Sequence, residues 1–308
     1  MTLPLSKALS ASFAYFTAEA GRIVRVLWAP VLLFQIGAVL VMPLYSEALL
    51  GMFDESVAGD PEASLRALGP MFAWAGVITL AWLIYNAVCA AGLLRHLTRG
   101  EDIATLAYLR FGADELRVFF TTLLVGLILL IAYAGGILGV ALVIGVAAAI
   151  NSALGALLGL VGGIGFIVIL ALIALRLSLA APAAIATRGL GVAPSWNAAK
   201  GCGWSLFGFW LIWGLIIVFV ASVYSTLAMP DYFDDMAELM AAPEGSDEYF
   251  AINRRIMEES FAVWDPGNPR FALTFALGYL YMFALAAIAP VASGVAYRLV
   301  TEGQDARD

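Results

Sequence analysis

Long runs without a charged residue dominate the hydropathy pattern of this chain. A helix needs about 20 apolar residues, at about 1.5 Å each, to span the hydrocarbon layer of a bilayer, so each such run predicts a membrane span. The runs cover residues 26–46, 67–94, 118–175, 201–230 and 271–297. The third is too long for one helix, and the polar pair Asn151 and Ser152 predicts a turn that divides it. The pattern therefore predicts an all-α, polytopic membrane protein with six transmembrane helices arranged as three hairpins.

Segments that mix apolar and polar residues precede the first, third and fifth spans, and they end at Gly21, Gly112 and Gly201. These are predicted interfacial amphipathic segments, and residues 101–112 are expected to form a helix that lies flat at the interface or docks on its neighbours. The glycines are 91 and 89 residues apart. This spacing favours a repeated unit, because a second marker shares the 89-residue period. The alternative is that any six-span protein places glycines at helix ends.

The repeat defines three hairpin units within a single membrane domain of residues 1–308. The units cover residues 1–100, 101–189 and 190–308, and the third contains an acidic helical loop, residues 231–270. Its first acids share one helical face, and Ser246 is the expected N-cap of a second helix with an apolar stripe that folds back on the membrane or the hairpins. The acids on the first face are Asp231, Asp234, Asp235 and Glu238. A calcium site among them is the less favoured alternative to a solvated face, because no EF-hand loop is present.

Composition agrees with a membrane protein. Of the 308 residues 63% are hydrophobic and only 13% are charged, and the mean hydropathy is +0.94, which leaves too little polar surface to cover a soluble globule. The net charge of −7 argues against a nucleic-acid partner. Cys89 and Cys202 are far apart and form no C-x-x-C pair, so no disulfide framework or cysteine metal site is expected.

Lysine and arginine are unevenly divided between the two predicted faces. The face with both termini holds 12 of the 16 basic residues and 8 of the 23 acidic ones, so the other face holds 4 basic and 15 acidic residues. Basic residues resist translocation, so both termini are expected to be cytoplasmic. Phospholipids are the partners that this basic face predicts, because anionic headgroups attract juxtamembrane cations.

The third and fourth spans are rich in glycine at intervals of four residues, a spacing that lets membrane helices approach closely. We expect this spacing to serve helix packing within the hairpin, with self-association or a partner membrane protein as the alternative. The glycines at this spacing are Gly135, Gly139, Gly155, Gly159 and Gly163.

The longest apolar stretch meets charge, proline and tryptophan at residues 176–200. Arg176 is expected at the inner border of the fourth span rather than within it, with Pro182 as the hinge of the segment that follows. This segment is a candidate lipid-headgroup site, and plain anchoring at the interface is the alternative. The candidate residues are Arg176, Arg188, Ser195, Asn197, Lys200 and Trp204.

The same segment carries a family resemblance. The motif is Arg176-Leu-Ser-Leu-Ala-Ala-Pro182 followed by Gly191, Ser195, Lys200-Gly201, Trp204 and Phe207. It resembles the six-span membrane domain of bacterial glycerophosphodiester phosphodiesterases and of related stand-alone inner-membrane proteins. The resemblance implies a multi-pass protein of the bacterial inner membrane, linked to lipids or envelope upkeep. The sequence ends at Asp308 without a catalytic domain, so no phosphodiesterase activity is expected.

Catalytic patterns are absent from the sequence. His96 is the single histidine, H-E-x-x-H and the phosphate-binding G-x-x-x-x-G-K-[ST] loop are missing, and no run contains the charged residue that a transporter pathway needs. We therefore expect no enzyme, no cofactor and no metal. The sequence favours a protein that binds or organises anionic lipid, with an accessory or assembly subunit of a membrane complex as the alternative and a transporter as the third reading.

Overall fold

The computed structural model describes residues 3–51, 61–102 and 107–305, and within these ranges the chain forms helices and no strand. Six helical stretches are long and apolar enough to cross a membrane: α2, α3, α4, α5 continued by α6, α8 and α11. The prediction of an all-α, polytopic membrane protein is thus confirmed. The helices are α1 (Leu5–Ala18), α2 (Ala20–Leu50), α3 (Pro61–Arg99), α4 (Ala113–Ile150), α5 (Ser152–Leu177), α6 (Ala180–Thr187), α7 (Val192–Ala198), α8 (Gly203–Ala228), α9 (Tyr232–Ala241), α10 (Asp247–Ala262) and α11 (Phe271–Asp305).

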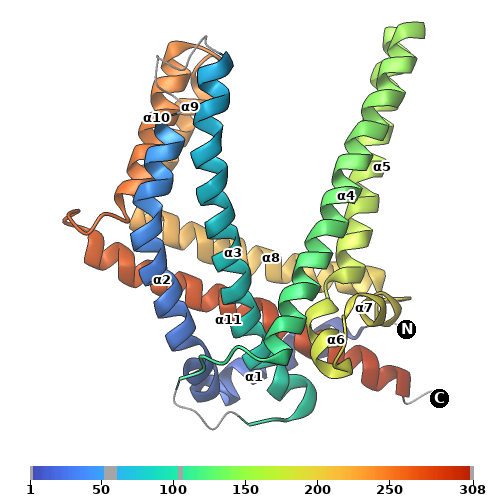
Figure 1. Ribbon diagram of the computed structural model, residues 1–308. Coiled ribbons are helices and arrows are strands. Elements are labelled where there is room, and N and C mark those ends of the chain that lie inside the picture. The colour runs from blue at the N-terminus through green and yellow to red at the C-terminus, as the bar shows by residue number, and fades with distance from the viewer. Residues whose placement is uncertain (1–2, 52–60, 103–106, 306–308) are drawn as a thin grey trace.

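The long helices pair as three hairpins, α2 with α3, α4 with α5, and α8 with α11. Figure 1 shows the α2–α3 and α4–α5 hairpins rising on opposite sides, with α8 and α11 running across the lower part of the view between them. The α4–α5 hairpin meets the rest of the chain through α3, α6, α7 and α8. The most apolar stretches of α4 and α5 bury none of their residues inside the protein.

The turn predicted at Asn151 separates α4 from α5. The Asn151 side-chain oxygen accepts a hydrogen bond from the backbone N–H of Ala153 at 2.8 Å and so caps the first turn of α5. Because α5 begins at Ser152, Arg176 is the penultimate residue of this helix. Arg176 therefore lies at the end of α5 rather than within it, as the sequence predicts.

A break separates α5 from α6 at Ser178 and Leu179, one turn before Pro182. Proline has no N–H, and its ring clashes with the carbonyl four residues earlier, which here belongs to Ser178. The helix is therefore interrupted near the predicted hinge, but the interruption comes before Pro182, which lies in the first turn of α6.

Two of the three predicted interfacial segments are helical, as α1 and α7. The helix predicted for residues 101–112 is wrong for the described part, because residues 101–102 and 107–112 are not helical, and residues 103–106 lie outside the described ranges. Tyr108 is buried against the hydrophobic core instead of lying on one face of a helix. Contacts with distant helices therefore override the apolar periodicity of this segment.

Two clusters of buried apolar side chains form the core. One joins α2, α3, α4, α6 and α11, and the other joins α1, α6, α7, α8 and α11. Helix α11 supplies residues to both, among them Val291 to the first cluster and Ala292 to the second, and α6 does the same through Ile185 and Ala183. These two helices connect the hairpins into one packed body.

The acidic loop forms the two helices α9 and α10. The Ser246 hydroxyl accepts a hydrogen bond from the N–H of Tyr249 at 3.1 Å, so the predicted N-cap is confirmed. Ile252 and Ile256 of the apolar stripe are buried, and α10 packs on α9 and α2. Helix α10 thus folds back on the first hairpin, as predicted.

The acidic face of α9 is partly neutralised from within the loop. Arg255 of α10 forms ion pairs with Asp235 at 2.8 Å and with Glu238. These hydrogen-bonded carboxylates raise the pKa of the Arg255 side chain. Ion pairs at an exposed surface contribute little to stability, so their role is to orient α10 against α9.

Candidate functional site

Residues 176–200, which we call the border segment, run from the end of α5 through α6 and α7. The guanidinium of Arg176 lies over the ring of Trp196 at 4.7 Å from its centroid, a cation–π contact between α5 and α7. The buried Ser195 hydroxyl donates a hydrogen bond to the Arg176 carbonyl at 2.6 Å. This bond satisfies a carbonyl that loses its helical partner where α5 ends. Ser195 therefore holds the segment together and does not face a ligand.

Close approach of two backbones shapes the middle of the border segment. A Cβ atom at Gly191 would lie 2.5 Å from the Ala184 nitrogen and closer still to the Ala180 carbonyl oxygen, so only glycine fits against α6 here. Arg188, at the end of α6, adopts a left-handed conformation with φ of 55°. Together these positions turn the chain from α6 into α7.

The other four candidate residues, Arg188, Asn197, Lys200 and Trp204, are exposed. Within the described ranges, neither Arg188 nor Lys200 forms an ion pair. The Trp204 side chain is 89% exposed and meets Phe207 edge to face at 6.1 Å. Of the six candidate side chains, the Ser195 hydroxyl thus bonds to the Arg176 carbonyl, and the side chains of Arg188, Asn197, Lys200 and Trp204 lie at the surface.

An apolar groove of about 470 Å³ lies beside the border segment, between α5 and α8. We call it the border groove. The Trp210 indole donates a hydrogen bond to the Ser178 hydroxyl at 3.0 Å across its polar end. Leu175, directly before Arg176, and Phe207, the neighbour of Trp204, are part of its wall. An apolar groove therefore adjoins the end of α5, where the half-buried Arg176 lies.

Sequence reasoning missed a buried ionic network between α3 and α4. Arg95 donates to Asp114 at 2.8 Å and lies 3.1 Å from a carboxylate oxygen of Glu115. The Glu115 side chain is 0% exposed and also accepts from Gly112 N at 2.7 Å and from the Tyr108 hydroxyl. Burial and the Glu115 hydrogen bond raise the pKa of Tyr108, so its hydroxyl keeps the proton that it donates. The sequence did contain a signal for this network: Arg95 follows the second charge-free run, and the oppositely charged Asp114 and Glu115 precede the third.

The single histidine belongs to a second polar cluster. His96 of α3 is hydrogen-bonded through Nδ1 to the Tyr15 hydroxyl of α1 at 3.0 Å, and its Nε2 accepts from Arg22 of α2. Arg22 also pairs with Glu19 at 2.8 Å and with Asp102. Burial raises the pKa of Tyr15 to about 12, although Arg22 opposes the shift. The cluster ties the helix α1 to the first hairpin and contains no group arranged as an activated nucleophile.

The glycines of the α4–α5 hairpin fall into two groups. Gly155 lies against Ala148, and Gly159 lies against Ile144, so these two permit close packing of α5 on α4. A Cβ atom at Gly135, Gly139 or Gly163 would meet nothing within 4 Å. The hairpin packs through one face of each helix and leaves a second set of glycines on its open surface.

The structure places no group of three or more His, Cys, Asp or Glu side chains where they could hold a metal ion, as far as its described residues extend. No family model matches this chain, and no curated protein or solved structure matches it. The chemistry of the surface is therefore the basis for a function.

Proposed function

We propose that this protein binds anionic phospholipid at the face that carries its termini, and that the border segment with the border groove is the binding site. The observation that carries the proposal is an apolar groove at the end of α5, in a segment whose three cations, Arg176, Arg188 and Lys200, form no ion pair with any described residue. A phospholipid presents the matching chemistry, a phosphate and an acyl chain. The proposed setting is the bacterial inner membrane with both termini in the cytoplasm, as the loop charges and the family resemblance suggest.

The basic residues of this face divide into two groups. Those that form ion pairs within the protein are Arg22, Arg95, Arg99, Arg117 and Arg298. Those that form none among the described residues are Lys7, Arg25, Arg110, Arg176, Arg188 and Lys200. Half of the second group belongs to the border segment. Cations that no carboxylate of the described residues neutralises remain available for phosphate, which supports a headgroup role.

The double variant Arg188→Gln with Lys200→Gln tests the proposal. Each juxtamembrane cation contributes about 1 kcal/mol of attraction to an anionic surface, so losing two is expected to weaken phosphatidylglycerol binding by about 30-fold. Both side chains are exposed, so the fold should be unchanged. Native mass spectrometry of the protein titrated with phosphatidylglycerol in mild detergent measures the affinity.

The matched control is Arg66→Gln with Arg270→Gln, which removes two exposed arginines from the opposite predicted face. It should leave the affinity within about twofold of the wild-type value, since exposed charges far from the site are screened. Equal weakening by both double variants would refute a site at the border segment.

A second candidate function is that of an accessory or assembly subunit that docks through the α4–α5 hairpin. Helix α4 has 38 residues, about 57 Å at 1.5 Å per residue, whereas the hydrocarbon layer is about 30 Å thick. The apolar surface of this hairpin is uncovered by the rest of the chain along its most hydrophobic part. A partner membrane helix would cover it, with the open glycines at the contact.

Leucine at both Gly135 and Gly139 is expected to block such a contact without disturbing the hairpin, because both positions face open space. The double variant should then migrate as a smaller species than the wild type after mild extraction, as measured by size-exclusion chromatography with light scattering. Gly145→Leu, also at an open position, is the control and should keep the wild-type mass. A wild-type protein that is itself a monodisperse monomer would speak against this function.

A further inference from the structure

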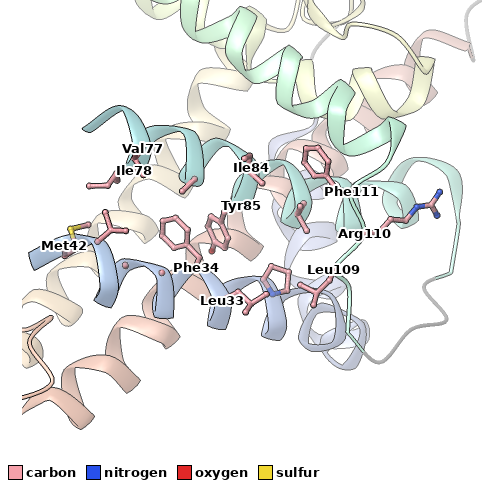
Figure 2. Close-up of a pocket in the computed structure, with 16 residues that line it drawn as sticks. Leu33, Phe34, Met42, Val77, Ile78, Ile84, Tyr85, Leu109, Arg110 and Phe111 are labelled. Carbon is pink, nitrogen blue, oxygen red and sulfur yellow. The ribbon is translucent and has the colours of Figure 1, made fainter. Parts of the chain in front are cut away.

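An apolar groove of about 500 Å³ runs between α2 and α3 and shares no lining residue with the border groove. Figure 2 shows its lining, from Met42 and Val77 at one end to Leu109, Arg110 and Phe111 at the other. We call it the α2–α3 groove. Its volume lies within the range of about 300–1,000 Å³ that is typical of small-molecule sites.

Small residues create this groove. Gly37, Ala38 and Ala81 line it where larger side chains would let the two helices fill the space, and a Cβ atom at Gly37 would meet nothing within 4 Å. Phe34 and Tyr85 stack at 4.5 Å between ring centroids and join the two helices at its base. The Tyr85 hydroxyl donates to the Met282 carbonyl of α11 at 3.1 Å, which fixes this ring in place. The groove is thus built into the packing of three helices.

The ends of the groove differ in polarity. The lining is apolar along α2 and α3, and exposed Leu33, Val77 and Ile84 continue it onto the outer surface. At the other end lies Arg110, which is exposed and forms no ion pair with any described residue. Its guanidinium extends away from the groove, beyond the rim (Figure 2). An apolar slot therefore ends at a free cation.

We propose that the α2–α3 groove holds one acyl chain of an anionic phospholipid whose phosphate is bound by Arg110. An apolar slot open to the surface of two membrane-spanning helices is filled by hydrocarbon, and the cation at its end complements a phosphate. The site is separate from the border segment, so it stands or falls independently of the variants at Arg188 and Lys200.

Photolabelling tests the chain position. The full-length protein is placed in nanodiscs that contain phosphatidylglycerol with a diazirine on its acyl chain, and labelled peptides are mapped by mass spectrometry. Labels on α2 and α3 near Gly37, Ala38 and Ala81 are expected to exceed those on the lipid-exposed α4–α5 hairpin. Gly37→Leu fills the groove and should reduce this labelling to the level of the hairpin, whereas Gly37→Ala should retain it.

Gly76→Leu is the matched control. Gly76 also lies in a membrane helix with open space around it, but it does not line the groove, so this variant should label like the wild type. Both leucines replace a helical glycine, so their effects on helix propensity are the same. If the groove is labelled as strongly in the Gly37→Leu variant as in the Gly76→Leu variant, the proposal is overturned.

Arg110→Gln tests the phosphate contact. In this variant, unlabelled phosphatidylglycerol is expected to compete about fivefold more weakly against the photolabel, because one juxtamembrane cation contributes about 1 kcal/mol of attraction. Its competition should then approach that of phosphatidylcholine. If phosphatidylglycerol and phosphatidylcholine compete equally well against the photolabel for the wild-type protein, the assignment of an anionic lipid is contradicted.

Discussion

Replacing Glu115 by alanine is expected to lower the free energy of unfolding by about 3 kcal/mol, the lower end of the cost of breaking a buried ion pair, because Arg95 keeps Asp114 as its second partner. Glu115 is fully buried and neutralises Arg95, which is itself almost fully buried. The variant would also leave the Gly112 N–H and the Tyr108 hydroxyl without their acceptor. Unfolding in a detergent–SDS titration, followed by circular dichroism, measures the change.

A double-mutant cycle separates the ion pair from other effects of the substitution. Arg95→Met combined with Glu115→Leu removes both charges, and replacing a buried pair by apolar residues is often close to neutral. The double variant should therefore be more stable than the single variants Arg95→Met and Glu115→Leu. If it is less stable than both single variants, the network is not held by this ion pair.

Gly191→Ala is expected to destabilise the protein by about 3 kcal/mol or more, because overpacking that must move backbone atoms is at the upper end of its usual cost. The added methyl group would overlap the backbone of α6 at Ala180 and Ala184. The loss should be greatest in the border segment. Hydrogen–deuterium exchange is expected to show faster exchange in α6 and α7 than in α2 and α3.

Gly203→Ala is the control for this change, because a Cβ atom at Gly203 meets nothing within 4 Å. It should leave both stability and exchange unchanged or slightly improved, since alanine favours helix more than glycine does. If α6 and α7 of the Gly191→Ala variant exchange at the wild-type rates, the prediction is contradicted, because the two helices would then accommodate the methyl group without loss of stability.

The six spans could be predicted from the sequence because each depends on local composition. Charge-free runs of sufficient length fix the number of spans, Asn151 fixes the turn in the longest run, and Ser246 fixes the start of α10. These signals act within a few residues along the chain. They predict the structure correctly because no distant contact competes with them.

Features that depend on distant contacts could not be predicted in the same way. Residues 101–112 have an apolar periodicity typical of a helix, yet Tyr108 is drawn to Glu115 and the core. Arg176 and Ser195 were placed in one candidate set, but nothing in the spacing indicates that Ser195 bonds to the Arg176 carbonyl. The two grooves likewise depend on which faces of separate helices meet.

The position of α11 has a consequence for biosynthesis. Helix α11 is synthesised after the other five spans, and it lines both clusters of the core. Translation adds about 5–20 residues per second, so the earlier spans wait in the bilayer with unfilled contact surfaces until α11 arrives. During that interval the first hairpin and α8 depend on lipid or on an insertion factor to cover them.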